Sequence, residues 1–95
     1  MITKGTPQYK EAQKMANELT RMAGYDRIYN NSLYEISFNA MGMFLEHIKE
    51  LNVFASQIAE TVSKTMMMYS RSICRMSDKQ AWCLACAAVE NNIEL

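Results

Sequence analysis

Apolar residues recur at intervals of three and four along most of this chain, which is the period of an amphipathic α-helix. The first periodic segment starts after Thr6-Pro7, where Thr6 can act as an N-cap and Pro7 is tolerated at the first helical position. Gly24 then supplies a natural C-terminal stop. The apolar face comprises Tyr9, Ala12, Met15, Ala16, Leu19, Met22 and Ala23. The pattern predicts a helix over residues 7–23.

The second periodic segment is much longer and follows the turn-forming pair Asn30-Asn31. Ser32 and Glu35 have the spacing of a capping box. The apolar rhythm then continues without a proline through Leu33, Ile36, Ala40, Phe44, Ile48, Leu51, Ala55, Ile58, Val62, Met66, Tyr69 and Ile73. We predict one central helix over about residues 33–74, with a break near Glu50 to Val53 as the alternative because Asn52 is the weakest position.

The last helix begins at a second capping box, Ser77-Asp78-Lys79-Gln80. Its core stripe is Trp82, Ala85, Val89 and Ile93, and Asn91-Asn92 is expected to end it. This predicts a helix over about residues 78–92. Since no segment shows sustained β alternation, we expect an all-α fold of three helices in a single domain, residues 1–95.

An unbroken central helix would be about 60 Å long at 1.5 Å per residue. A compact domain of this size has a diameter of roughly 32 Å, so such a helix would need cover from another subunit. Apolar residues that surround the helix instead of forming one stripe favour the same interpretation. We therefore predict a homo-oligomer, a dimer above all, in which the central helix completes the bundle. The predicted interface residues are Met41, Phe44, Met66, Met67 and Met68.

Composition narrows the choice of compartment and partner. Ten basic and ten acidic residues balance, so no global field favours nucleic acid or membrane. The longest uncharged apolar run, Ala81 to Val89, is far shorter than the ~20 residues of a membrane span, and we expect no membrane association. An odd number of cysteines, three, favours free thiols in a reducing cytoplasm.

A basic stripe offers a candidate ligand site. Lys64, Arg71 and Arg75 would share one face of the predicted central helix, in a stretch that contains no acidic residue. Such a stripe could bind the phosphates of a nucleotide or nucleic acid. A solvated helix face is the favoured interpretation, because net charge is zero and no glycine-rich phosphate loop is present.

Cys83 and Cys86 form a C-x-x-C motif, which suits a redox dithiol or half of a zinc site. Redox motifs usually open a helix, whereas Cys83 lies well inside its predicted helix. A zinc site needs four ligands, and the remaining candidates are Cys74 and the sole histidine, His47, without a second C-x-x-C motif. We therefore expect structural thiols, with no metal and no cofactor.

No nucleophile–base set is recognisable, so the sequence favours a protein without catalytic activity. We expect a small helical binding or inhibitor module that acts as a homo-oligomer and has a protein partner. Accessory proteins of phages and mobile elements are often of this kind, which is an association and no deduction from residues. The two alternatives are an anionic-ligand binder and a thiol-based redox or metal protein.

Overall fold

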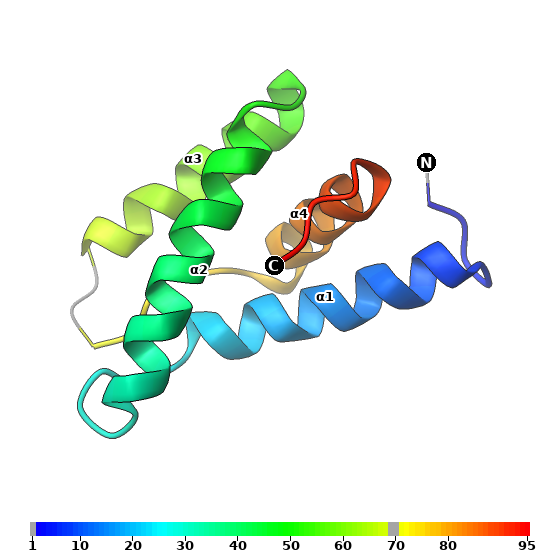
Figure 1. Ribbon diagram of the computed structural model, residues 1–95. Helices are drawn as coiled ribbons and strands as arrows, with labels where there is room; N and C mark the ends of the chain where they lie inside the picture. The colour runs from blue at the N-terminus through cyan, green and yellow to red at the C-terminus, as the bar shows by residue number, and fades with distance from the viewer. Residues whose placement is uncertain (1, 69–70) are drawn as a thin grey trace.

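The computed structural model describes residues 2–68 and 71–95, and this part of the chain is built from four helices with no strand. They are α1 (Pro7–Ala23), α2 (Asn31–Lys49), α3 (Val53–Met68) and α4 (Asp78–Glu90). Figure 1 shows α2 and α3 side by side and antiparallel. The all-α prediction is confirmed, whereas the prediction of three helices is wrong because the central segment folds back on itself.

The predicted bounds of α1 are confirmed. The Tyr9 amide donates to the Thr6 hydroxyl oxygen at 3.3 Å, and Pro7 occupies the first turn. At the other end, the Gly24 amide donates to the carbonyls of Arg21 and Met22. Local signals at both ends therefore coincide with the apolar period between them.

The predicted long helix breaks at Leu51-Asn52, as the alternative allowed. The Ala55 amide donates to the Asn52 side-chain oxygen at 2.9 Å, and the Ser56 amide donates to the Asn52 carbonyl at 3.0 Å. Asn52 thus caps the start of α3, the role in which asparagine is strongly preferred. The break lets Ala55, Ala59 and Val62 of α3 join the core that α2 helps to form. The molecule measures 39 × 25 × 19 Å, so helix length no longer requires a second subunit.

The chain beyond α3 also differs from the prediction, which continued the helix to residue 74. Helix α3 ends at Met68, residues 69 and 70 of the predicted helix lie outside the described residues, and residues 71–77 are irregular. Ile73 and Cys74 of this irregular segment are buried. The Arg75 amide donates to the Thr65 hydroxyl oxygen at 2.9 Å, which ties the segment to α3.

Helix α2 begins two residues earlier than the proposed Ser32 cap predicts. The Asp26 carboxylate accepts hydrogen bonds from the amides of Ile28 and Tyr29 at 2.7 and 3.0 Å. This turn leads into α2, whose N-cap residue is Asn30. Ser32 therefore lies within the first turn, and its predicted capping box is not formed. Sequence spacing alone could not reveal that Asp26 shapes the entry.

The predicted capping box of α4 is confirmed. The Gln80 amide donates to the Ser77 hydroxyl oxygen at 3.1 Å, and the Ser77 amide donates to the Gln80 side-chain oxygen at 3.0 Å. The helix ends at Glu90, two residues before the predicted end. Asn92 adopts a positive φ of 56°, and the Ile93 amide returns to the Ala88 carbonyl. This is the Schellman type of helix ending.

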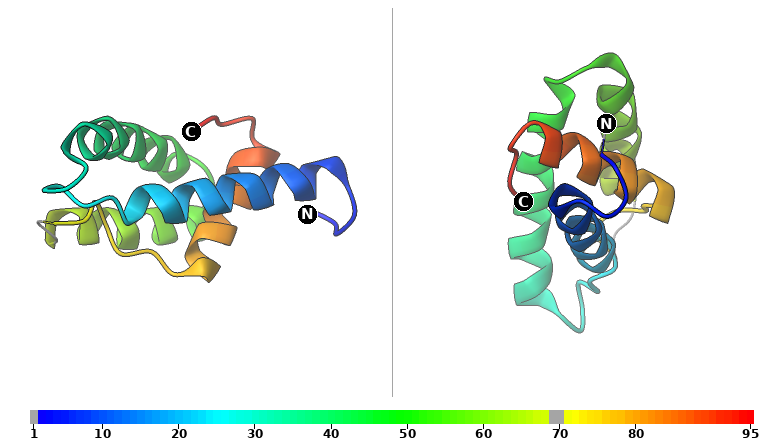
Figure 2. Two further views of the ribbon diagram at one scale, coloured as in Figure 1. Left: turned by 90° about the horizontal axis from the view of Figure 1, so that it is seen from below. Right: turned by 90° about the vertical axis from the view of Figure 1, so that its right-hand side faces the viewer.

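One core unites the four helices. Helix α1 packs chiefly against α4, and both helices also contact α2 (Figure 2). Small side chains let α1 and α4 approach closely, and Tyr9 meets Trp82 edge to face at a centroid distance of 5.1 Å. These small buried residues are Ala12, Ala81, Ala85 and Ala88.

Ser77→Ala should lower the free energy of unfolding by about 1 kcal/mol, because it removes an N-cap acceptor. Ser32→Ala is the matched control, since Ser32 is exposed in the first turn of α2 without a capping bond. Urea denaturation followed by circular dichroism would compare them. Equal losses in the two variants would contradict the assigned helix starts.

Candidate binding surfaces

Helix α2 carries a second apolar face besides the one it buries. Leu33, Ile36 and Met43 are 48%, 68% and 66% exposed, and half-buried Ala40 lies between them. We call these four residues the α2 stripe. Their spacings of three, four and three place them on one side of the helix. The buried face consists of Ser37, Met41, Phe44, Leu45 and Ile48.

The surface beside the α2 stripe is hollowed at Gly42. A shallow groove of about 430 Å³ is lined by Phe38, Asn39, Gly42, Met43, Glu46 and His47. Beyond its two chain neighbours and the backbone of its own helical turn, a Cβ atom built on Gly42 would meet no atom within 4 Å. The missing side chain therefore opens the surface and is not required by packing inside the chain.

Exposed apolar residues also lie at both ends of α2. Ile28 and Tyr29 precede its first turn, and Val53 and Phe54 follow the turn after its last residue. Together with the exposed members of the α2 stripe they make seven of the ten exposed large hydrophobic residues of the described chain. The uncovered apolar surface is therefore concentrated along α2.

The predicted interface residues have different environments. Met41 and Phe44 are fully buried in the core of the single chain, so the structure leaves neither accessible to a second copy. Met66 is half-buried against the core. Met67 and Met68, at the end of α3, are 87% and 76% exposed. Of the five residues, only this last pair offers a large free apolar surface.

The predicted basic stripe does not form on a helix, because only Lys64 lies in α3. Arg71 and Arg75 belong to the irregular segment that follows. The Arg71 guanidinium pairs with the Asp26 carboxylate at 3.0 Å and lies 5.9 Å from the Tyr29 ring centroid. Arg71 thus joins the loop before α2 to the segment after α3, which gives it a structural role that sequence reasoning missed.

The three cysteines are free thiols. Burial raises the pKa of Cys74 to about 11, and burial together with Glu90 and Cys83 raises the pKa of Cys86. Raised values leave little thiolate at neutral pH, which is the opposite of a redox-poised thiol. Across the described part of the chain, no three side chains of His, Cys, Asp or Glu gather as a metal site.

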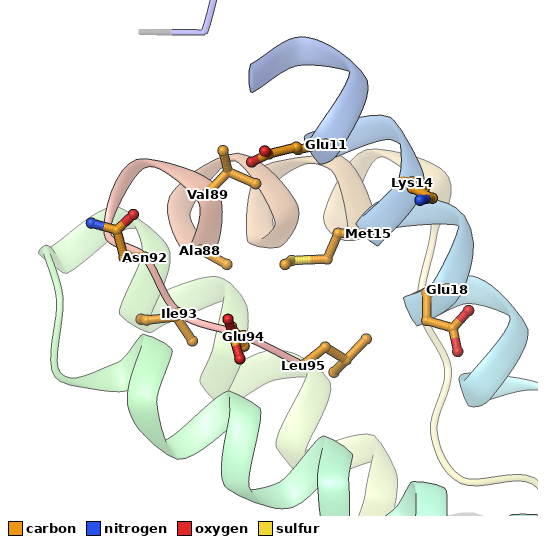
Figure 3. Close-up of a pocket in the computed structure, with 10 residues that line it drawn as sticks. All are labelled: Glu11, Lys14, Met15, Glu18, Ala88, Val89, Asn92, Ile93, Glu94 and Leu95. Atoms are coloured by element: carbon orange, nitrogen blue, oxygen red, sulfur yellow. The ribbon is translucent and has the colours of Figure 1, made fainter. Parts of the chain in front are cut away.

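A pocket of about 520 Å³ lies between α1, the end of α4 and the residues after it. Figure 3 shows Met15, Ile93 and Leu95 around an apolar floor, with Glu11 and Lys14 towards the rim. Glu18, also on the rim, forms an ion pair with Arg21. The lining includes no histidine, cysteine, serine, threonine or tyrosine.

Asp26 gives the fold a testable pH dependence. Hydrogen bonds from the Tyr29 and Ile28 amides, with the Arg71 pair, hold the pKa of Asp26 below its ordinary 3.8. Its carboxylate therefore stabilises the folded state above that pH, and the contribution is lost as pH falls through the lower folded pKa. Asp26→Asn should be less stable than wild type at neutral pH, and the difference should vanish in acid. Thermal melts across pH would check this, and a constant difference would contradict it.

Over residues 2–68 and 71–95, the helices lack the combined length and apolarity that crossing a bilayer requires. Comparisons with protein-family models, with curated proteins and with solved structures found no match.

Proposed function

We propose that this protein is a non-enzymatic helical binding module that acts as a homo-oligomer and presents a second surface to a protein partner. The observation that carries the proposal is the uncovered apolar surface of the α2 stripe. Contiguous exposed apolar patches on small proteins mark interaction sites, because leaving them in water is unfavourable.

The total surface supports the same proposal. The single chain exposes 6276 Å², whereas a monomer of its 10.9 kDa mass typically exposes about 5,600 Å². The excess, on the order of 700 Å², is close to the ~800 Å² that each partner buries in a standard interface. An oligomer that covers α2 would remove this excess.

Met67 and Met68 are the surface that we propose for a protein partner. They are well exposed and lie on a different helix from the α2 stripe. Methionine is flexible and polarizable and is enriched in adaptable contact surfaces. A role as an inhibitor would follow if this surface covered a functional site of the partner.

The two other functions considered have less support. An anionic-ligand site would need Lys64, Arg71 and Arg75 to act together, but Arg71 is already paired with Asp26. A redox or metal role would need reactive thiols, and the pKa of Cys86 is raised. We therefore favour the binding module over both.

Light scattering behind a sizing column tests the proposal. We expect wild type to have about twice the 10.9 kDa chain mass, as symmetric dimers are the commonest closed assembly. Cys83→Ala/Cys86→Ala should retain that mass, since the thiols are not proposed to act. A wild type that keeps one chain mass at high concentration would contradict the homo-oligomer.

A further inference from the structure

We propose that α2 pairs with α2 of a second copy in antiparallel orientation, with the twofold axis level with Phe38. The inference rests on the homo-oligomer of the proposed function and names its contact surface. It differs from the interface expected from the sequence, because Met41 and Phe44 are buried within their own chain.

The α2 stripe has the spacing of a helix–helix seam. Leu33, Ile36, Ala40 and Met43 alternate in steps of three and four, as the core positions of a coiled coil do. His47 continues the rhythm by one further step within the helix, and Tyr29 has the corresponding spacing in the turn before it; both are exposed. The seam therefore extends along the whole helix, which is about 28 Å long.

An antiparallel register places large residues opposite small or flexible ones. In such a pair the two kinds of core position face each other, so Ile36 meets Ala40 of the second copy and Leu33 meets its Met43. Ala40 and the neighbouring Gly42 leave room for close approach. Tyr29 would then lie level with His47 of the second copy, which closes the seam symmetrically.

Charge at the two ends of α2 selects the antiparallel direction. Around its N-terminal end, Arg27 and Arg71 balance Asp26 and Glu35. Around its C-terminal end, Glu46 and Glu50 outweigh Lys49 and leave one net negative charge. An antiparallel pair keeps the two negative ends apart, and the helix dipoles add to this preference. A parallel pair would bring the two negative ends together.

The same direction covers the exposed apolar residues that lie beyond the two ends of α2. Ile28 precedes α2, and Val53 and Phe54 lie just beyond its other end. Antiparallel pairing brings the first end of one copy beside the second end of the other. The contact can then exceed the seam itself and approach the ~800 Å² per partner of a standard interface.

Sedimentation equilibrium across a concentration series tests the surface. Ile36→Glu/Met43→Glu should raise the dissociation constant at least about 100-fold, because two apolar side chains of the seam become charged. Met67→Glu/Met68→Glu is the matched control, with two still more exposed residues on α3, and should keep the wild-type constant. Circular dichroism would verify that both variants remain helical.

A cross-linking experiment tests the direction without relying on disruptive variants. In a Cys83→Ala/Cys86→Ala background, Ile36→Cys and Ala40→Cys chains of different mass are mixed and oxidised. We expect disulfides between the two chain types. Disulfides of each chain type with itself would overturn the antiparallel register.

The outcomes separate this inference from the proposed function. A wild type that stays monomeric at every concentration would overturn both the α2 pair and the homo-oligomer. A wild type and an Ile36→Glu/Met43→Glu variant that dimerise equally would overturn the α2 pair alone. Dissociation of the Met67→Glu/Met68→Glu control would likewise move the contact from α2 to α3.

Discussion

Phe44→Ala should lower the free energy of unfolding by about 3–5 kcal/mol, which is the usual cost of truncating a large buried aromatic residue. Phe44 is 1% exposed and is the largest of the fully buried side chains of the described residues. Its removal leaves a cavity in the region where α2 meets the other helices. Small domains are stable by only 5–15 kcal/mol, so the variant should lose a large share of its total stability.

Phe54→Ala is the matched control, because Phe54 has the same side chain but is 65% exposed at the start of α3. In protein dilute enough to be monomeric, it should change stability far less, within the range of surface substitutions. Urea denaturation at several protein concentrations would make the comparison. A Phe44→Ala loss that disappears on dilution would show that Phe44 belongs to an intersubunit contact, as the sequence alone suggested.

The helices α1 and α4 could be predicted because their signals are local. Thr6 and Ser77 cap the first turns through their own side chains, within three residues of the amides they bind. Gly24 follows the last residue of α1. When the N-cap, the apolar period and the C-terminal stop agree over one segment, packing against the rest of the chain changes the helix bounds little.

The fold-back at Asn52 could not be read with the same certainty. Ile48, Leu51 and Ala55 keep the helical spacing of apolar residues across the break. One long helix and two antiparallel helices would therefore show the same apolar pattern there. Only the cap made by Asn52 and the shared core of α2 and α3 distinguish them. The core is a nonlocal property, which periodicity does not report.

The α2 stripe was concealed by the same rhythm. Leu33, Ile36 and Ala40 lie on the outer face, whereas Phe44 and Ile48, the next members of the apolar series, lie in the core. Steps of three and four allow a series to drift from one face to the other. The basic stripe does not form on one helix for a related reason, because Arg71 and Arg75 would share a face with Lys64 only if α3 continued past Met68.

Ile73→Ala should lower the free energy of unfolding by about 2–5 kcal/mol, although Ile73 lies outside any helix. Its side chain is fully buried and belongs to the same core as Phe44. It anchors the irregular segment, which forms two further hydrogen bonds to the rest of the chain. The Arg75 amide donates to the Thr65 hydroxyl oxygen, and the Arg71 carbonyl accepts from the Arg27 amide. Truncation should therefore loosen these hydrogen bonds as well as open a cavity.

Ile28→Ala is the matched control, because Ile28 is also an isoleucine outside the helices but is largely exposed. In protein dilute enough to be monomeric, its loss should be small, as for other exposed positions. Denaturant melts would compare the two variants, and hydrogen exchange would follow the Arg27 and Arg75 amides. Faster exchange of both amides in Ile73→Ala, but not in Ile28→Ala, is the expected result. Equal stability of the two variants would mean that the segment before α4 does not close the core.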